Sequence, residues 1–404
     1  MSATSGNTPG TPRVLRAMND RAALDLLLEH GPLSRTRIGK LTGLSKPTAS
    51  QLLARLEAAG LVVATGVTEG RPGPNAQLYA VNGRAAYAAG LDVTPRRIRA
   101  AVADLTGAVA GEFELATPKK AAGDVARQVT EALDGAVKAA GITRGEVRRL
   151  VIGTPGAFDP STGRLRYASH LPGWHSATLL DELAAALPMP VEYENDVNLV
   201  AVAEQRLGAA RGHADFVLLW NQEGLGAALV LGGRLHRGFT GGAGEVGFLP
   251  VPGAPLVRQV TRANSGGFQE LAGAQVLARL AREYGVEDVP RGEHSEVAAE
   301  LVRRAAGAGS GPYARLLDAF ATGLATGLAS LVAVLDPELV VLSGEVIVAG
   351  GEALRERVEA ELGELAASRP RLVVGGVQRH PVLRGALESA LAATRDEVFD
   401  TSRR

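Results

Sequence analysis

One strand–turn–strand pattern occurs twice in this chain and constrains the fold more than any other feature. The first copy spans residues 90–115 and the second spans residues 216–239, about 125 residues further on. Segments of helical and of strand-like pattern alternate after each copy, as is typical of α/β domains. The repeat therefore predicts a duplicated α/β domain whose two lobes face a cleft.

The composition excludes several classes of protein. The 404 residues, 46% hydrophobic and 21% charged, suffice for two or three globular domains. The chain has no cysteine, which excludes disulfides, thiolate nucleophiles and cysteine-based zinc sites. It also has no run of 18 apolar residues and no apolar signal core near its N-terminus. We therefore expect a cytoplasmic protein with no membrane partner.

The N-terminal part differs in pattern from the rest. Residues 1–12, rich in Ser, Thr, Gly and Pro, predict a flexible tail. Three helices are expected next: residues 13–30, a short helix opened by Leu33-Ser34 with Ser34 as N-cap, and residues 46–59, capped by Ser45. A hairpin over residues 61–81 follows. Three helices with a tight turn before the third, then a hairpin, are typical of a winged helix-turn-helix, which we place at residues 13–82.

The third of these helices carries a polar outer face suited to DNA. Short hydroxyls, an amide and basic groups can reach base edges and phosphates in the major groove, and an Arg at the hairpin tip can enter a minor groove. Through Asn82 the chain has nine basic and five acidic residues, so this part is net positive. The competing interpretation is that the polar residues only solvate a surface helix. The candidate DNA contacts are Arg35, Ser45, Lys46, Thr48, Ser50, Gln51, Arg55 and Arg71, with Arg35 and Arg55 as phosphate contacts.

A series of short motifs follows in the body of the chain. They read GTPG at 153–156, LPGW at 171–174, ENDVN at 194–198, GAARG at 208–212, GGAGEVG at 241–247 and LDPELVVL at 335–342. In this order they resemble the ROK family of sugar kinases and repressors, over about residues 88–398. The resemblance implies an α/β fold, a two-lobed actin-like ATPase (ribonuclease H-like) domain at 88–404. Lobe one is expected at about 88–194 plus the C-terminal helix, and lobe two at about 195–378.

Asn195 and Asp196 follow a predicted strand, at the edge where α/β folds place ligands, and their amide and carboxylate suit sugar hydroxyls. The resemblance implies that Asp196 matches the catalytic base of the family's kinases, here a vestigial one, and that Glu245 and Glu270 hold further hydroxyls. Gly156 and His170 are the other candidate ligand contacts. The simpler interpretation is that the acids are solvated surface groups and that the His is structural.

The departures from the family pattern bear on catalysis. Where the family's kinases have a Gly-rich phosphate turn after the first Asp, residues 92–97 contain Pro95, which lacks an N–H. The second phosphate loop, residues 221–226, contains Glu223, whose charge would repel phosphate. Phe248 stands at the family's zinc-binding His, and the Cys ligands are missing. We therefore expect no kinase activity, no cofactor and no metal.

Taken together, the sequence predicts a DNA-binding transcriptional regulator, a repressor of carbohydrate metabolism genes. Its partners are operator DNA and an effector that is a sugar, an amino sugar or a sugar phosphate, and it is a homodimer or homotetramer because one winged helix reads few base pairs. Two alternatives stay open. One is an active ATP-dependent sugar kinase with an added DNA-binding head, and the other is a DNA binder that needs no ligand.

Overall fold

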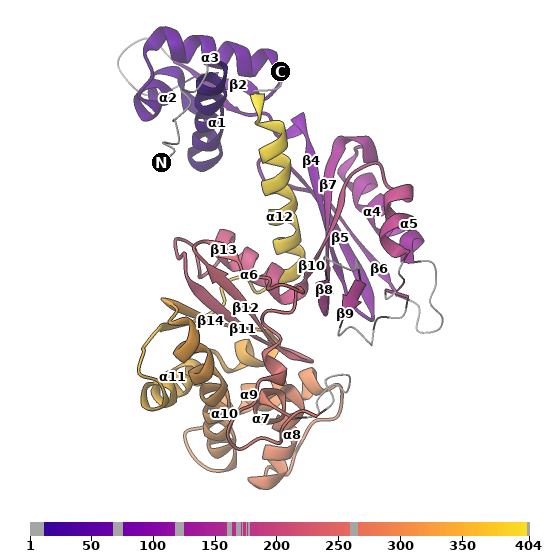
Figure 1. Ribbon diagram of the computed structural model, residues 1–404, viewed down its shortest axis with the longest axis vertical. Coiled ribbons are helices and arrows are strands. Elements are labelled where there is room, and N and C mark those ends of the chain that lie inside the picture. The colour runs from indigo at the N-terminus through magenta and orange to yellow at the C-terminus, as the bar shows by residue number, and fades with distance from the viewer. Residues whose placement is uncertain are drawn as a thin grey trace, which may run out of the picture.

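A computed structural model of the chain describes residues 12–67, 76–117, 125–159, 164–166, 171, 173–174, 176, 178–258 and 266–401. Figure 1 shows a small head joined to a body of two lobes. A long helix, α12 (Pro381–Val398), runs from the region between the lobes to the head. The flexible tail expected at residues 1–12 lies outside the described residues except for Pro12, which begins the first helix.

The head is a winged helix-turn-helix, as predicted. Ile38, Leu52 and Leu56 are fully buried in its core. Ser34 is the N-cap of the second helix, as predicted, because its hydroxyl accepts a hydrogen bond from the N–H of Arg37. Leu33 and Ser34 also pair with the last strand of the wing and form a short strand that was not predicted, so the wing has three strands in the order β1-β3-β2. Its elements are α1 (Pro12–His30), β1 (Leu33–Ser34), α2 (Arg35–Thr42), α3 (Lys46–Ala58), β2 (Val62–Val67) and β3 (Gln77–Val81).

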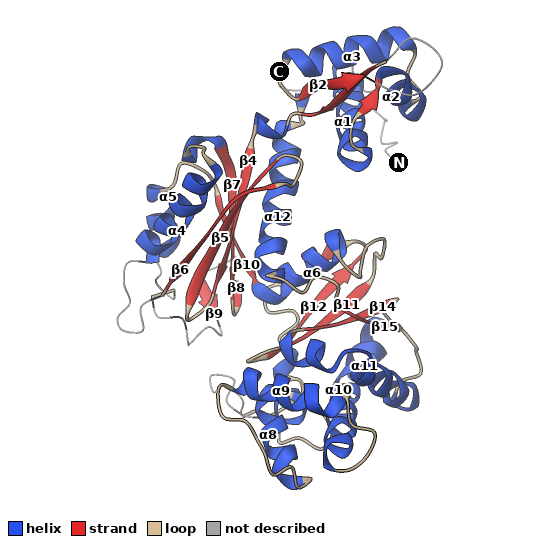
Figure 2. Ribbon diagram, turned by 180° about the vertical axis from the view of Figure 1, so that it is seen from behind, coloured by secondary structure: helices blue, strands red, loops and turns tan. Residues whose placement is uncertain are grey.

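Lobe one is a five-stranded sheet in the order β10-β7-β4-β5-β6, covered on one face by α4 and α5 (Figure 2). The first three strands in sequence form an antiparallel meander, and the last two pair in parallel. The elements are β4 (Tyr87–Val93), β5 (Arg97–Asp104), β6 (Val109–Ala116), α4 (Val125–Ala140), β7 (Val147–Thr154), α5 (Leu179–Ala186) and β10 (Val191–Asn195), with a small hairpin of β8 (Ala157–Asp159) and β9 (Arg164–Arg166).

Lobe two repeats this topology. Its sheet has the order β13-β12-β11-β14-β15, again with an antiparallel meander followed by two parallel strands. The predicted duplication is therefore confirmed. The strands are β11 (Phe216–Asn221), β12 (Leu225–Leu231), β13 (Arg234–Leu235), β14 (Leu339–Ser343) and β15 (Arg371–Val374); the helices are α7 (Phe268–Ala272), α8 (Ala274–Glu283), α9 (His294–Ala306), α10 (Pro312–Leu335) and α11 (Glu345–Leu365).

Two helices lie between the sheets. Residues of α6 (Asp196–Leu207) and α12 share one buried cluster with residues of both sheets, among them Val151 in lobe one and Phe216 in lobe two. Helices α6 and α12 therefore lie between the two sheets and connect the lobes through one shared core.

Helix α10 is, within the described residues, the one helix long and apolar enough to cross a membrane by length and composition. Phe320, Leu324 and Leu328 on this helix are fully buried in the core of lobe two. The apolar character of α10 is therefore explained by its packing.

Candidate functional site

Asn195 lies where β10 ends and α6 begins. Its side-chain oxygen accepts a hydrogen bond from the backbone N–H of Asn198 at 3.1 Å, so Asn195 is the N-cap of α6. Its side-chain nitrogen donates to the carbonyl oxygen of Gly156 at 3.1 Å. Gly156 has φ of 92°, in the region that favours glycine. The structure thus brings Asn195 and Gly156 together, and the cap orients the amide of Asn195.

Three acids from different elements form a group that we call the carboxyl cluster: Asp92, Asp196 and Glu245. The pKa of Asp196 is raised to about 7, chiefly because its carboxyl group is removed from water. The hydrogen bond from the N–H of Val197, 2.8 Å long, opposes this shift, whereas the negative charges of Asp92 and Glu245 add to it. The charges of both lobes therefore act on Asp196.

The other two members of the cluster are also withdrawn from water. Asp92, at the end of β4, is buried, which raises its pKa to about 6 although Arg99 and Arg97 lower it. The guanidinium of Arg99 lies 3.7 Å from the carboxylate of Asp92. Burial likewise raises the pKa of Glu245.

The loop that carries Glu245 runs close to the backbone of both lobes. A Cβ at Gly241 would lie 2.1 Å from the carbonyl oxygen of Phe158 in β8, and one at Gly244 would lie 2.0 Å from that of Ala227 in β12. Both glycines also have positive φ. Only glycine fits at these two positions, so the two glycines fix the course of the loop that carries Glu245.

The carboxyl cluster can both donate and accept hydrogen bonds near neutral pH. A carboxylate only accepts, whereas a protonated carboxyl group also donates. Groups whose pKa lies at about 6 and about 7 supply both forms. Such a set suits a ligand with several hydroxyl groups, and a carboxyl with a pKa of about 7 also suits proton transfer.

The structure describes Glu270 but not His170, the two remaining candidate ligand contacts. Glu270 lies in the first turn of α7, which packs against the turn Val246–Phe248 that follows Glu245. The two glutamates therefore come from contacting elements. His170 lies outside the described residues.

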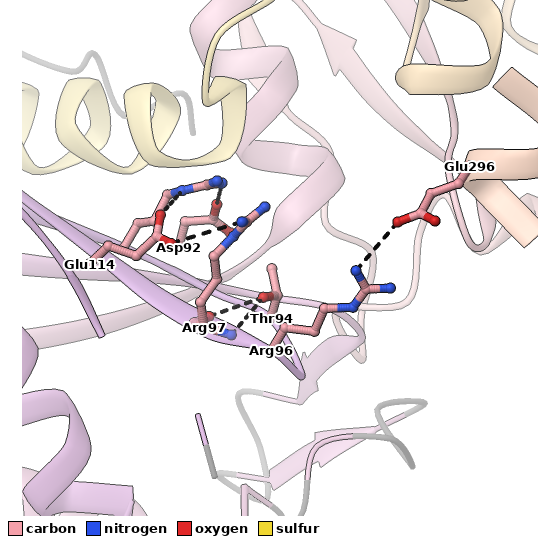
Figure 3. A network of polar contacts seen from close by, with 7 residues as sticks. Asp92, Thr94, Arg96, Arg97, Glu114 and Glu296 are labelled. Atoms are coloured by element: carbon pink, nitrogen blue, oxygen red, sulfur yellow. Dashed lines mark hydrogen bonds and ion pairs between the residues drawn. The ribbon is translucent and has the colours of Figure 1, made fainter. Parts of the chain in front are cut away.

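The turn between β4 and β5 stands where the family's first phosphate loop would lie, and Figure 3 shows its contacts. The hydroxyl of Thr94 accepts a hydrogen bond from the N–H of Arg97 and donates to the carbonyl oxygen of the same residue, which closes the turn. Arg96 reaches across to lobe two and forms ion pairs with Glu293 and Glu296 at the start of α9. The guanidinium of Arg96 therefore links this turn of lobe one to helix α9 of lobe two.

The loop around Glu223 contacts the same helix. The carboxylate of Glu223 accepts hydrogen bonds from the backbone N–H of Ser295, at 3.2 Å, and from the hydroxyl of Ser295. The N-terminus of a helix favours an anion, because its first N–H groups have no partner within the helix. Here a side chain of the protein occupies that place at α9.

The sequence did not single out Arg96, Arg237 or Glu194 as site residues. Glu194 accepts hydrogen bonds from the side chain of Asn198 at 2.8 Å and from Arg237 of lobe two at 2.6 Å. This is a second ion pair between the lobes. Glu194 stands next to Asn195 in the ENDVN motif, so the sequence could have indicated it as a site residue. The pairing of Glu194 with Arg237 depends on tertiary structure and could not be predicted.

The outer face of α3 is exposed, as a DNA-reading helix requires. Ser45, Lys46, Thr48 and Gln51 are exposed, and the hydroxyl of Ser45 accepts from the N–H of Thr48, so Ser45 is the helix N-cap. Arg35 of α2 is also exposed and donates to the hydroxyl of Ser50 at 3.1 Å. These six predicted contacts therefore lie together on α2 and α3 of the head.

The remaining two candidate DNA contacts, Arg55 and Arg71, are not shown free on this face. Arg55 lies on α3, but its guanidinium donates to the buried carboxylate of Asp20 on α1 at 2.6 Å. Arg71 lies outside the described residues.

The fold and the carboxyl cluster define a winged helix joined to a two-lobed sugar-kinase-like body. The model of the ROK family matches residues 88–390, and the model of the MarR family matches residues 18–71. The chain belongs to the ROK family.

Proteins similar to this chain include both regulators and kinases. A putative xylose repressor from Caldicellulosiruptor sp. (strain Rt8B.4) is 26% identical over 86% of this chain and 88% of its own length. The crystal structure of a ROK hexokinase from Thermus thermophilus is 30% identical, with a TM-score of 0.64 over 77% of this chain and 99% of that chain. A ROK family transcriptional regulator, described as a homologue of the E. coli MLC protein, shares the fold with a TM-score of 0.74, 21% identity, and 96% and 97% coverage.

Proposed function

We propose that this protein is a transcriptional repressor of carbohydrate metabolism genes. One observation carries the proposal: a winged helix with an exposed polar recognition face and a ROK body with a carboxyl cluster between its lobes occur on one chain. The head binds operator DNA through α3, and the body binds a sugar, an amino sugar or a sugar phosphate. Such a protein acts in the cytoplasm.

The effector binds at the carboxyl cluster. Asn195, Asp196, Glu245 and Glu270 hold its hydroxyl groups, and Gly156 orients Asn195. Acids dominate around Asp196, which favours a neutral sugar or an amino sugar. A sugar phosphate binds only if a cation such as His170 faces it.

An active sugar kinase is the second candidate, because the pKa of Asp196, at about 7, suits a general base. We infer that this chain is not a kinase. Glu223 is bonded at the N-terminus of α9, and Arg96 is paired with two glutamates, so the residues present do not fit the phosphates of a nucleotide. We therefore propose no ATP-dependent reaction for this chain.

Footprinting on the DNA around the protein's own gene tests the repressor proposal. We expect a protected inverted repeat, bound by a dimer, because one winged helix reads only a few base pairs. A failure to protect any sequence there would overturn the proposal. A coupled ATP-hydrolysis assay with a panel of hexoses separates the second candidate, since turnover near 1 s⁻¹ lies in the ordinary enzyme range and would show a kinase.

A further inference from the structure

Helix α12 begins near the carboxyl cluster. Its N-cap residue, His380, lies where burial, and then the charges of Arg99 and Arg379, lower the pKa of His380. Arg99 is also the partner of Asp92 in the carboxyl cluster. With 18 residues, α12 is about 27 Å long. It therefore reaches from the neighbourhood of the cluster to the head (Figure 1).

The body packs closely against the backbone of α12. A Cβ at Gly385 would lie 1.8 Å from the carbonyl oxygen of Leu199, which belongs to the first turn of α6, the helix that starts at Asp196. A Cβ at Gly90 in β4 would lie 2.8 Å from the backbone nitrogen of Leu387. Close-packed backbones do not slide independently. A displacement of α6 or β4 must therefore be transmitted to α12.

The far end of α12 is anchored in the head. Phe399, just after the helix, is buried in the same cluster as Leu24 of α1, and the guanidinium of Arg21 lies 5.6 Å from the centre of its ring. Arg21 also donates to the carboxylate of Asp396 at 2.8 Å. These contacts fix α1 to the last turn of α12.

One buried carboxylate then joins this end to the recognition helix. Asp20 of α1, which is 3% exposed, accepts a hydrogen bond from Thr401 at 3.1 Å on one oxygen and from Arg55 of α3 at 2.6 Å on the other. Among the described residues, Asp20 thus bonds both the segment after α12 and the helix that faces DNA.

We propose that Asp20 is a positioning residue that sets Arg55 and α3 relative to the end of α12, and through α12 relative to the carboxyl cluster. The inference rests on the proposed function, because it states how a sugar at the cluster changes the affinity for operator DNA. Arg55 reaches DNA only in the geometry that Asp20 and Thr401 allow. A ligand that shifts α6 shifts this junction.

The full-length double variant Asp396→Ala/Thr401→Val tests the proposal, because it removes two contacts to the head and touches neither the cluster nor the exposed face of α3. Glu397→Ala is the matched control: Glu397 lies on the same turn but pairs with Arg149 of lobe one at 3.6 Å. Operator affinity is measured by fluorescence anisotropy with and without D-xylose and D-glucose, and sugar affinity by calorimetry.

We expect the control to keep the wild-type ratio of operator affinities with and without sugar. The double variant should bind sugar with unchanged affinity while this ratio falls from the usual 5–150-fold to about twofold or less. Thr401→Ser, which keeps the hydroxyl, should retain the wild-type ratio. A wild-type ratio in the double variant would overturn the inference.

Amide hydrogen exchange without sugar keeps the test independent of the effector. If neither sugar changes operator affinity in the wild type, neither is the effector, and the junction is judged by exchange alone. The double variant should then exchange about tenfold faster at amides of α3 and at an unchanged rate in α6, because only the contacts to the head are lost. Unchanged exchange in α3 would overturn the inference.

Discussion

At the scale of single residues, we propose that Asp196 is the central acid of the ligand site. It combines burial with two acidic neighbours, so its pKa rises to about 7. A carboxyl group that stays protonated up to neutral pH in the native state, but ionises near pH 4 when unfolded, makes the protein less stable as pH rises from 4 to 7. Asp196 therefore lowers the stability of the native state near neutral pH.

Replacing Asp196 by Asn should therefore stabilise the protein at high pH. At pH 8 the free energy of unfolding of Asp196→Asn should exceed that of the wild type by about 1–3 kcal/mol, because the native state of the variant no longer holds a carboxylate away from water. Near pH 4 the difference should vanish. Urea unfolding at both pH values measures it, with Glu131→Gln, an exposed acid of α4, as the control. A variant that is equally stabilised at pH 4 and pH 8 would contradict the account.

At the scale of elements, the sequence predicted most of the head and of both sheets. Ser34 and Ser45 are caps because a hydroxyl precedes each helix, and local patterns of this kind can be read from the chain. The strand β1 could not be foreseen, since its two residues become a strand only by pairing with β3. The same holds for the site: Asn195 and Asp196 follow a strand in sequence, whereas the role of Arg96 depends on a helix about 200 residues away.

Helix α3 yields a prediction about DNA. Gln51→Ala should weaken operator binding by about 1–3 kcal/mol and relax the preference at one base pair, because an amide can bond a base edge at two points. Lys46→Ala should weaken binding to all sequences alike and make it less dependent on salt. Anisotropy with operator duplexes mutated one base pair at a time measures both. Glu57→Gln, exposed at the end of α3, is the control; an equal loss in this control would show that the effect is not one of base recognition.

At the scale of the whole molecule, ion pairs between described residues cross from one lobe to the other: Arg96 pairs with Glu293 and Glu296, and Glu194 pairs with Arg237. Arg96 lies in the turn between β4 and β5, where the resemblance to the family's kinases implies a phosphate loop. Side chains of the protein itself therefore hold the two lobes together at these points.

Reversing one of these charges should open the lobes. Arg96→Glu places three acids side by side and should weaken sugar binding by about two- to tenfold, since exposed pairs contribute up to about 1 kcal/mol. Adding Glu296→Arg should restore most of the affinity. Calorimetry and small-angle X-ray scattering measure the affinity and the separation of the lobes. Arg282→Glu, an exposed position on α8, is the control, and failure of the second substitution to restore binding would contradict the role of this pair.

The central claim is that a sugar at the carboxyl cluster controls DNA binding by the head. Anisotropy with the footprinted operator, titrated with sugars, amino sugars and their phosphates, tests it most directly in the wild type and in Asp196→Ala. We predict that at least one compound changes the operator affinity of the wild type by about 5–150-fold, and that Asp196→Ala binds the operator normally but loses this response. The claim is contradicted if no compound changes the affinity of the wild type, or if the response survives in Asp196→Ala.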